Sequence, residues 1–261
     1  MHEPSSEPRA KRVVVLHSGG KDSTYSAWWA QMKGWEIVAM ASVLIDSDDS
    51  MMFQTDSTWV SGHQSRMMGV PWMPILSSGM EEEEVYDLQR GLEEGVESGT
   101  VEKWFADREI ACPDYISLIP ESWDGLVVGA LRSDYQKTRI ERLTSRLNVT
   151  LHSPLWRHDP MAHMQSLMSH NFQFVITSVS CEGLGREWLG RVIDQESLSD
   201  LVSLSEKYRF NVDGEGGEFE TIVTDAPSFA MPLELSGSEQ WYGNRGIFQI
   251  RSASPIQSYN K

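Results

Sequence analysis

The chain has 261 residues, 40% of them hydrophobic, and a formal net charge of −16 at pH 7. That length can hold one large domain or two modest ones, and the composition is typical of a globular protein. No apolar run approaches the roughly 20 residues that a membrane-spanning helix needs, so we expect no membrane partner. Because an acidic surface repels phosphate backbones, we expect no nucleic-acid partner either. The two cysteines show no disulfide or zinc-ligand spacing, which is typical of the reducing cytoplasm.

The first ordered segments predict a strand, a turn and a helix. Residues 1–12 are polar and predict a flexible tail. Residues 13–16 are apolar and mostly β-branched, which favours a buried strand of a parallel sheet. Residues 24–33 then predict a helix.

The turn between that strand and that helix carries the residue types of a phosphate-binding loop. It consists of Ser18, Gly19, Gly20, Lys21, Asp22 and Ser23. Glycines let the backbone turn tightly and approach a ligand, and the free amides at a helix N-terminus bind phosphate. The lysine adds a mobile positive charge, and the serines add hydroxyl donors. The alternative is an ordinary Gly-Gly turn with a solvated lysine. The six residues resemble the pyrophosphate-binding loop of the N-type ATP pyrophosphatases (PP-loop), whereas no P-loop or dinucleotide-binding signature is present.

The following elements alternate between strand and helix. Strands are predicted at 36–44 and 71–76 and a helix at 59–68, which indicates a doubly wound parallel α/β sheet of the Rossmann-like type. The polar residues 46–50 follow the second strand, at the edge where such sheets bind ligands. Their carboxylates could hold magnesium or a substrate amine, or the segment could be a solvated turn.

Residues 81–147 predict a further helix, a strand and a second helix. Residues 81–96 predict an acidic helix, with the glutamates at its N-terminus, where negative charge is favourable. A strand is predicted at 126–130, followed by a helix to about residue 147 with Asp134 as its cap. Residues 91–120 show no clear pattern.

The pattern changes near residue 150. Helices are predicted at 161–170 and 198–208, a strand at 172–178, and short strands and turns near the C-terminus. We therefore predict a nucleotide-binding domain over 13–149 and a smaller C-terminal α+β domain, for the substrate, over 150–261.

A second loop combines glycines with carboxylates. Glycine is entropically costly to order, so Gly214, Gly216 and Gly217 indicate a required backbone shape. Clustered carboxylates repel one another and need a cation such as magnesium, a substrate ammonium group or ammonia. We predict catalytic roles for the three carboxylates of this loop, Glu215, Glu218 and Glu220. The alternative is an acidic surface loop.

Three blocks of the sequence resemble the diphthine–ammonia ligase family. They are residues 18–23; Gly129, Ala130, Ser133, Asp134, Tyr135, Gln136, Thr138, Arg139 and Glu141; and residues 214–221 with Asp225, Ala226 and Pro227. Weaker matches are formed by Asp49, Ser50, Met52, Phe53 and Gln54 and by Leu189, Gly190 and Arg191. The resemblance spans about residues 12 to 230. Because the family usually joins the acidic helix directly to the next strand, residues 91–120 look like an insertion.

The resemblance implies an AMP-forming ligase that uses ATP and Mg²⁺ in the cytoplasm. Its substrate would be the diphthine carboxylate of translation elongation factor 2, activated as an acyl-adenylate and amidated by ammonium. Residues 18–23 would bind ATP, with Lys21 and Asp22 catalytic; Mg²⁺ would be held by the phosphates, and Asp22 could assist. Substrate-binding residues would be Asp49, Ser50, Gln54, Ser133, Asp134, Tyr135, Gln136, Arg139, Gly214, Gly216 and Gly217.

Some assignments stay open at this point. The glutamates could bind the trimethylammonium group of diphthine or capture ammonium, and Tyr135, Gln136 and Arg139 could pack two domains together instead. The sequence does not indicate the oligomeric state. Competing functions are a PP-loop enzyme that modifies transfer RNA and an ATP-binding sensor without turnover. The first would need a basic groove, and the second has no need of clustered carboxylates.

Overall fold

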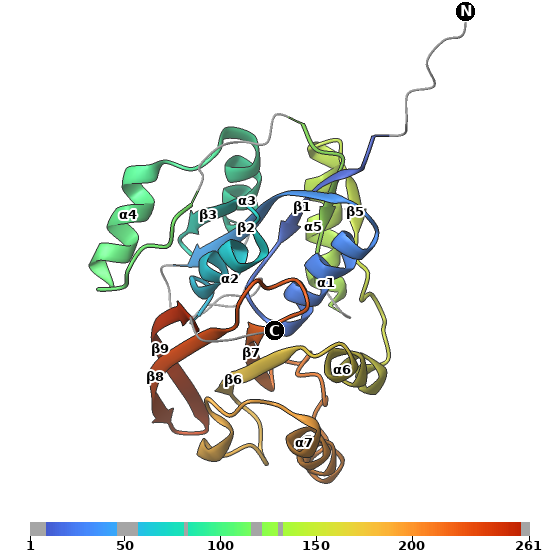
Figure 1. Cartoon of the computed structure of the whole chain (residues 1–261), viewed down its shortest axis with the longest axis vertical. Coiled ribbons are helices and arrows are strands. Elements are labelled where there is room, and N and C mark those ends of the chain that lie inside the picture. Colours follow the sequence, from blue (N-terminus) through green and yellow to red (C-terminus); the bar gives the residue numbers. More distant parts are fainter. Residues whose placement is uncertain (1–8, 46–56, 81–82, 116–121, 130–132, 257–261) are drawn as a thin grey trace, which may run out of the picture.

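In the computed structural model, residues 9–45, 57–80, 83–115, 122–129 and 133–256 are described. Their strands form two separate sheets, one parallel and one antiparallel (Figure 1).

The parallel sheet has five strands in the spatial order β3-β2-β1-β4-β5. They are β1 (Arg12–Leu16), β2 (Glu36–Ile45), β3 (Trp72–Ser77), β4 (Gly125–Val127) and β5 (Thr150–His152). From β1 the chain moves outward to β3 and then returns to the other side of β1 with β4. The loops that follow β1 and β4 therefore diverge at a switch point, where doubly wound sheets bind their ligands. The predicted doubly wound α/β class is confirmed.

Helices cover both faces of this sheet, which explains why residues 13–16 of its central strand are apolar. Apolar side chains of α3 and α5 cover one face, and those of α1 and α2 cover the other. The helix α4 packs near β3 through its apolar side chains. These elements are α1 (Lys21–Met32), α2 (Val60–Met68), α3 (Glu83–Glu94), α4 (Ser98–Asp107) and α5 (Asp134–Arg146).

The second sheet is antiparallel, in the order β7-β6-β9-β8. The remaining elements are α6 (Pro160–Ser169), β6 (Gln173–Val179), the 3₁₀ helix η1 (Arg186–Trp188), α7 (Gln195–Tyr208), β7 (Phe219–Asp225), β8 (Leu233–Tyr242) and β9 (Arg245–Pro255). The predicted smaller α+β part at the C-terminus is confirmed.

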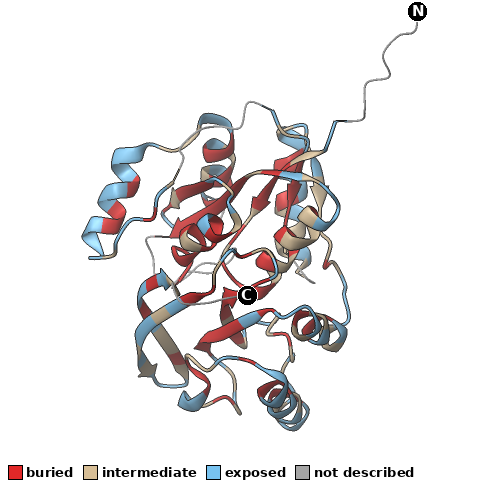
Figure 2. Cartoon of the chain, viewed as in Figure 1, coloured by how far each residue is buried: buried red, intermediate tan, exposed pale blue. Residues whose placement is uncertain are grey.

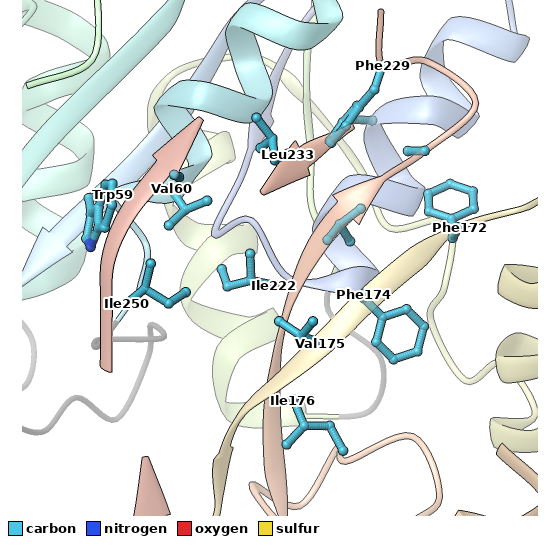
Figure 3. Close-up of a cluster of buried hydrophobic side chains, with 14 of the residues drawn as sticks. Trp59, Val60, Phe172, Phe174, Val175, Ile176, Ile222, Phe229, Leu233 and Ile250 are labelled. Atoms are coloured by element: carbon cyan, nitrogen blue, oxygen red, sulfur yellow. The ribbon is translucent and has the colours of Figure 1, made fainter. Parts of the chain in front are cut away.

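A single apolar cluster joins the two sheets. Trp59 and Val60, at the start of α2, lie beside Ile222 of β7 and Ile250 of β9 (Figure 3). Burial is accordingly continuous between the sheets (Figure 2). Because α1 and α2 are packed between the sheets, the loop before α1 lies directly against β7.

Three details differ from the predicted elements or go beyond them. The cap of α5 is Ser133, whose side-chain oxygen accepts a hydrogen bond from Gln136 N, and Asp134 is instead the first helical residue. The stretch 91–120 contains α4, which was not predicted; that this stretch is an insertion stays a prediction. The domain division at residue 150 also stays a prediction, and β5 pairs with β4 of the first sheet.

None of the described helices is long and apolar enough to cross a membrane.

Candidate active site

A cavity of about 340 Å³ lies beyond the carboxyl ends of β1 and β4. Three segments that are distant in sequence line it: the first glycine loop, the region around the start of α5, and the second glycine loop. It brings together these predicted site residues: Ser18, Gly20, Lys21, Asp22, Ser23, Ser133, Gln136, Gly214, Glu215, Gly217 and Glu220.

The first loop has the tight turn that its glycines predict. Gly19 has a φ of +84°, the left-handed region, and a Cβ there would lie 2.9 Å from Gln64 Oε1. Gly20 caps α1 in an extended conformation, and its carbonyl oxygen accepts hydrogen bonds from the side chains of Ser23 and Thr24. The helix therefore begins at Lys21, with its first N–H groups near the cavity.

Gln64 fastens this loop to the second sheet. Its Nε2 donates to Gly19 O at 2.9 Å and to Val223 O at 2.7 Å, while Val223 N also donates to Gly19 O. His17 Nε2 lies 2.9 Å from Gln64 Oε1. Since Gln64 uses its N–H groups on carbonyls, the His17 ring nitrogen is the donor in that pair. Burial lowers the pKa of His17 to about 4, although the Gln64 hydrogen bond opposes the shift.

The start of α1 is held from two further directions. The backbone N–H of Lys21 donates to Thr221 Oγ1 at 3.1 Å, and Lys21 Nζ lies 2.8 Å from Asp22 Oδ2. The other oxygen of Asp22 lies 2.7 Å from His163 Nε2. Burial by itself would raise the pKa of Asp22, but the charge of Lys21 and the hydrogen bond from His163 hold that pKa below its ordinary value. Asp22 is therefore a carboxylate whose two oxygens are both engaged.

Gly129 lets the end of β4 approach α1 closely. A Cβ at this position would lie 2.7 Å from Ser23 N and 2.9 Å from Asp22 O, both backbone atoms. Such atoms cannot move aside without displacing the helix. A glycine at this position therefore keeps the N-terminus of α1 next to the cavity.

Two of the three predicted glutamates line the cavity, one from the second glycine loop and one from β7. Gly214 and Gly217 have φ values of +72° and +80°, which explains the need for glycine at both. Glu215 lines the cavity and accepts a hydrogen bond from Ser133 N at 3.1 Å. Glu220 lines it as well, but it lies on β7 and not, as the sequence had predicted, on the loop.

Glu218 does not line the cavity. Its Oε1 accepts hydrogen bonds from both the backbone and the side-chain nitrogen of Asn211, and its Oε2 accepts one from Gly216 N at 2.7 Å. These contacts assign Glu218 to the shape of the loop, and its predicted catalytic role stays a prediction.

The helix α5 contributes its N-terminal turn. Ser133 and Gln136 line the cavity, whereas Asp134 is exposed and does not. The guanidinium of Arg139 lies 3.5 Å from the centre of the Tyr135 ring, so these two predicted substrate residues stack on each other outside the cavity lining.

The remaining predicted residues are more distant or outside the described ranges. Gly19, within the first loop, is buried and does not line the cavity, and Gly216 is exposed and does not line it either. Asp49, Ser50 and Gln54 lie outside the described residues. Within the described part of the chain, no group of three or more histidine, cysteine, aspartate or glutamate side chains could hold a metal ion. That Asp22 assists in binding Mg²⁺ stays a prediction.

Three residues that fix the site were not predicted from the sequence. Gln64, His163 and Thr221 act through partners 45 to 200 positions away in the chain. Thr221 belongs to the recognised third block, but no local pattern marks Gln64 or His163.

A doubly wound sheet with a loop of glycines, serines and a lysine at its switch point, sharing one cavity with a carboxylate-bearing loop, is the arrangement of an α/β enzyme of the nucleotide-binding class. The sequence profile of the diphthamide synthase N-terminal domain matches residues 11–107, and that of the C-terminal domain matches residues 159–256. The chain belongs to the diphthamide synthase family, whose curated members are ligases.

Two curated relatives show how far this similarity extends. The diphthine–ammonia ligase of Bos taurus is 32% identical over 239 residues, and that of Homo sapiens is 32% identical over 240 residues. Each alignment covers 87% of this chain and 84% of the relative. A solved structure titled as a predicted subunit of tRNA methyltransferase from Methanocaldococcus jannaschii covers 83% of this chain and 98% of its own, with 17% identity and a TM-score of 0.37.

Proposed function

We propose that this chain amidates the diphthine carboxylate of translation elongation factor 2 with ammonium, in the cytoplasm. ATP adenylates the carboxylate and releases pyrophosphate, and ammonia then displaces AMP to give the amide. Family membership supports the amidation. One observation supports the ATP-dependent step of the reaction. A single cavity is lined by the N-terminus of α1, with Lys21, and by the side chains of Glu215 and Glu220.

The residues around the first loop fit a triphosphate. The positive end of the α1 dipole and the Lys21 ammonium favour negative charge, and Ser18 and Ser23 add hydroxyl groups to the lining. A Cβ at Gly129 would collide with backbone atoms of α1, so glycine at this position lets the N-terminus of α1 lie against the end of β4, next to the cavity. Together these groups stabilise the charge that develops on the leaving pyrophosphate.

Magnesium fits this scheme as an ion held by the phosphates. Because both oxygens of Asp22 already accept hydrogen bonds, this carboxylate braces the loop in the arrangement described. When bound, Mg²⁺ supplies charge neutralisation on the triphosphate.

The carboxylates across the cavity suit a cationic group. Glu215 and Glu220 line the same cavity as the first glycine loop, and a pair of carboxylates there attracts ammonium or the trimethylammonium group of diphthine. Ser133 and Gln136, from the first turn of α5, supply polar groups that orient the substrate.

One assay separates this function from its rivals. The chain is incubated with ATP, Mg²⁺, ammonium and elongation factor 2 bearing diphthine, and AMP and the mass of the factor are measured. We expect AMP formation that requires the factor, together with conversion of the carboxylate to the amide. AMP formation that requires transfer RNA would instead support a tRNA-modifying enzyme, and ATP binding without AMP formation would support a sensor.

A further inference from the structure

His163 lies on α6, in the second half of the chain, yet its ring contacts the first turn of α1. The helix α6 begins at Pro160, and its cap Asp159 accepts a hydrogen bond from Ala162 N at 2.8 Å. His163 occupies the buried side of this helix and is 0% exposed. From there its Nε2 reaches Asp22 Oδ1 at 2.7 Å.

The position of this ring is set independently of Asp22. Met164 and Leu167 of the same helix are fully buried in the apolar cluster that joins the two sheets. The Tyr25 ring packs edge-on against His163 with ring centres 5.2 Å apart, and Tyr25 Oη lies 3.0 Å from Ser166 Oγ. The imidazole is therefore held in place by its own packing, and the Asp22 carboxylate is oriented by the hydrogen bond that it accepts from this ring.

A chain of three side chains then leads from α6 to the cavity. Asp22 accepts a hydrogen bond from His163 on Oδ1 and one from Lys21 on Oδ2. These two contacts together restrict the rotamers of Asp22 and Lys21. The Lys21 side chain is only 5% exposed, which shows how closely its ammonium is confined. A lysine that is free to move loses more conformational entropy when it binds a ligand than one that is already oriented.

We infer that His163 is a positioning residue: it orients Asp22, and Asp22 holds the Lys21 ammonium where the outer phosphates of ATP bind. This inference rests on the proposed function, because it deepens the role of the same loop. The residue contacts neither ATP nor the carboxylate of the substrate and acts through Asp22.

Two substitutions and two nucleotides test the inference. His163→Leu removes the donor and keeps an apolar side chain, whereas His163→Gln retains an N–H that can reach Asp22. We expect His163→Leu to weaken ATP affinity and raise the KM for ATP by about tenfold, as is typical for loss of a charge-assisted contact. Affinity for AMP, which lacks the outer phosphates, stays within about twofold. His163→Gln restores ATP affinity to within about threefold of the wild type.

The matched control is Tyr25→Phe. It removes the hydroxyl group that lies within hydrogen-bond distance of Ser166 at the same α1–α6 contact but leaves the His163–Asp22 pair intact, so ATP affinity should not change. Unchanged ATP affinity in His163→Leu would overturn the inference. Equal loss of ATP and AMP affinity, or a His163→Gln variant as weak as His163→Leu, would also overturn it.

Because the test measures nucleotide affinity, its result does not depend on whether the chain catalyses the ligase reaction. A wild-type chain that binds ATP but forms no AMP contradicts the proposed function, and the comparison of ATP with AMP still decides the role of His163. A wild-type chain that binds neither nucleotide contradicts both.

Discussion

The backbone N–H of Lys21 donates a hydrogen bond to the side-chain oxygen of Thr221, 200 positions later in the chain, at 3.1 Å. This bond joins the first turn of α1 to β7, at the point where the two sheets meet. Neither sheet forms the cavity by itself. The geometry of the first glycine loop therefore depends on how the C-terminal half docks.

Thr221→Val should weaken both folding and nucleotide binding. Valine keeps the shape of threonine but leaves the buried Lys21 N–H without its acceptor, which costs about 1–3 kcal/mol of unfolding free energy. Urea denaturation measures this loss, and titration with ATP should show a reduced affinity. Thr224→Val, on the same strand but bonded to Gln173 O, is the control and should leave ATP affinity unchanged. Unchanged stability and ATP affinity in Thr221→Val would show that the hydrogen bond does not matter.

Gly19→Ala should be more damaging than Gly34→Ala. Both glycines have positive φ values, +84° and +72°, so each substitution costs about 1–2 kcal/mol of backbone strain. A Cβ at Gly34 meets nothing within 4 Å, whereas one at Gly19 meets Gln64 Oε1 at 2.9 Å. We expect an extra loss of about 1–3 kcal/mol and loss of ATP binding in Gly19→Ala alone. Equal effects in the two variants would contradict the described packing of Gln64.

His17 should make stability depend on pH between about pH 6.5 and 4. Its pKa is lowered from 6.5 to about 4 in the folded chain, so the unfolded chain takes up the proton first as the pH falls. This group therefore removes about 1.4 kcal/mol of stability per pH unit within that window.

The test compares the wild type with His17→Gln by urea denaturation at several pH values. The stability advantage of the wild type over the variant should narrow as the pH falls below 6.5, since only the wild type carries this titrating group. A constant difference between the two chains from pH 7 to pH 4 would show that the pKa of His17 is not lowered.

The glutamates of the second glycine loop should separate into two kinds. Glu215→Gln removes the charge and keeps one oxygen that can accept from Ser133 N, the hydrogen bond that holds Glu215 at the cavity. Amide formation should fall by about 100-fold or more if the charge is required. Glu218→Gln replaces one of the two accepting oxygens by a donor, which opposes either Asn211 N or Gly216 N.

We therefore expect the unfolding free energy to fall more in Glu218→Gln than in Glu215→Gln. Full amidation activity in Glu215→Gln, measured by mass spectrometry of the modified factor, would exclude a role for its charge. Equal stability of the two variants would contradict the loop-shaping role of Glu218.

The doubly wound fold and the two glycine loops were predictable because their causes are local. The apolar, mostly β-branched residues 13–16 and the glycines after them specify a buried strand and a tight turn within about ten positions. Gly214 and Gly217 occupy backbone conformations that favour glycine, so their presence in the sequence marked a shaped loop. The helix α4 also carried a local signal, since Val101, Trp104 and Phe105 share one buried face, but the glycine in its first turn obscured it.

The supporting residues could not be predicted, because their partners are brought together only by the docking of the two halves. Gln64 bonds to carbonyl groups 45 and 159 positions away, and His163 bonds to Asp22 from 141 positions away. The cap of α5 was assigned one residue too late for a simpler reason: Ser133 and Asp134 are both residues that cap helices well. The position at which the backbone bends into the helix decides whether Ser133 or Asp134 is the cap.

The central claim is that the first and second glycine loops form one ATP-dependent amidation site. The most direct measurement is the amount of AMP and of amide formed from ATP, ammonium and diphthine-bearing elongation factor 2, for the wild type and for Lys21→Ala. We predict equal amounts of AMP and amide in the wild type, and a fall of both by at least about 100-fold in a folded Lys21→Ala variant. Amide formation without AMP, or full activity in Lys21→Ala, would contradict the account.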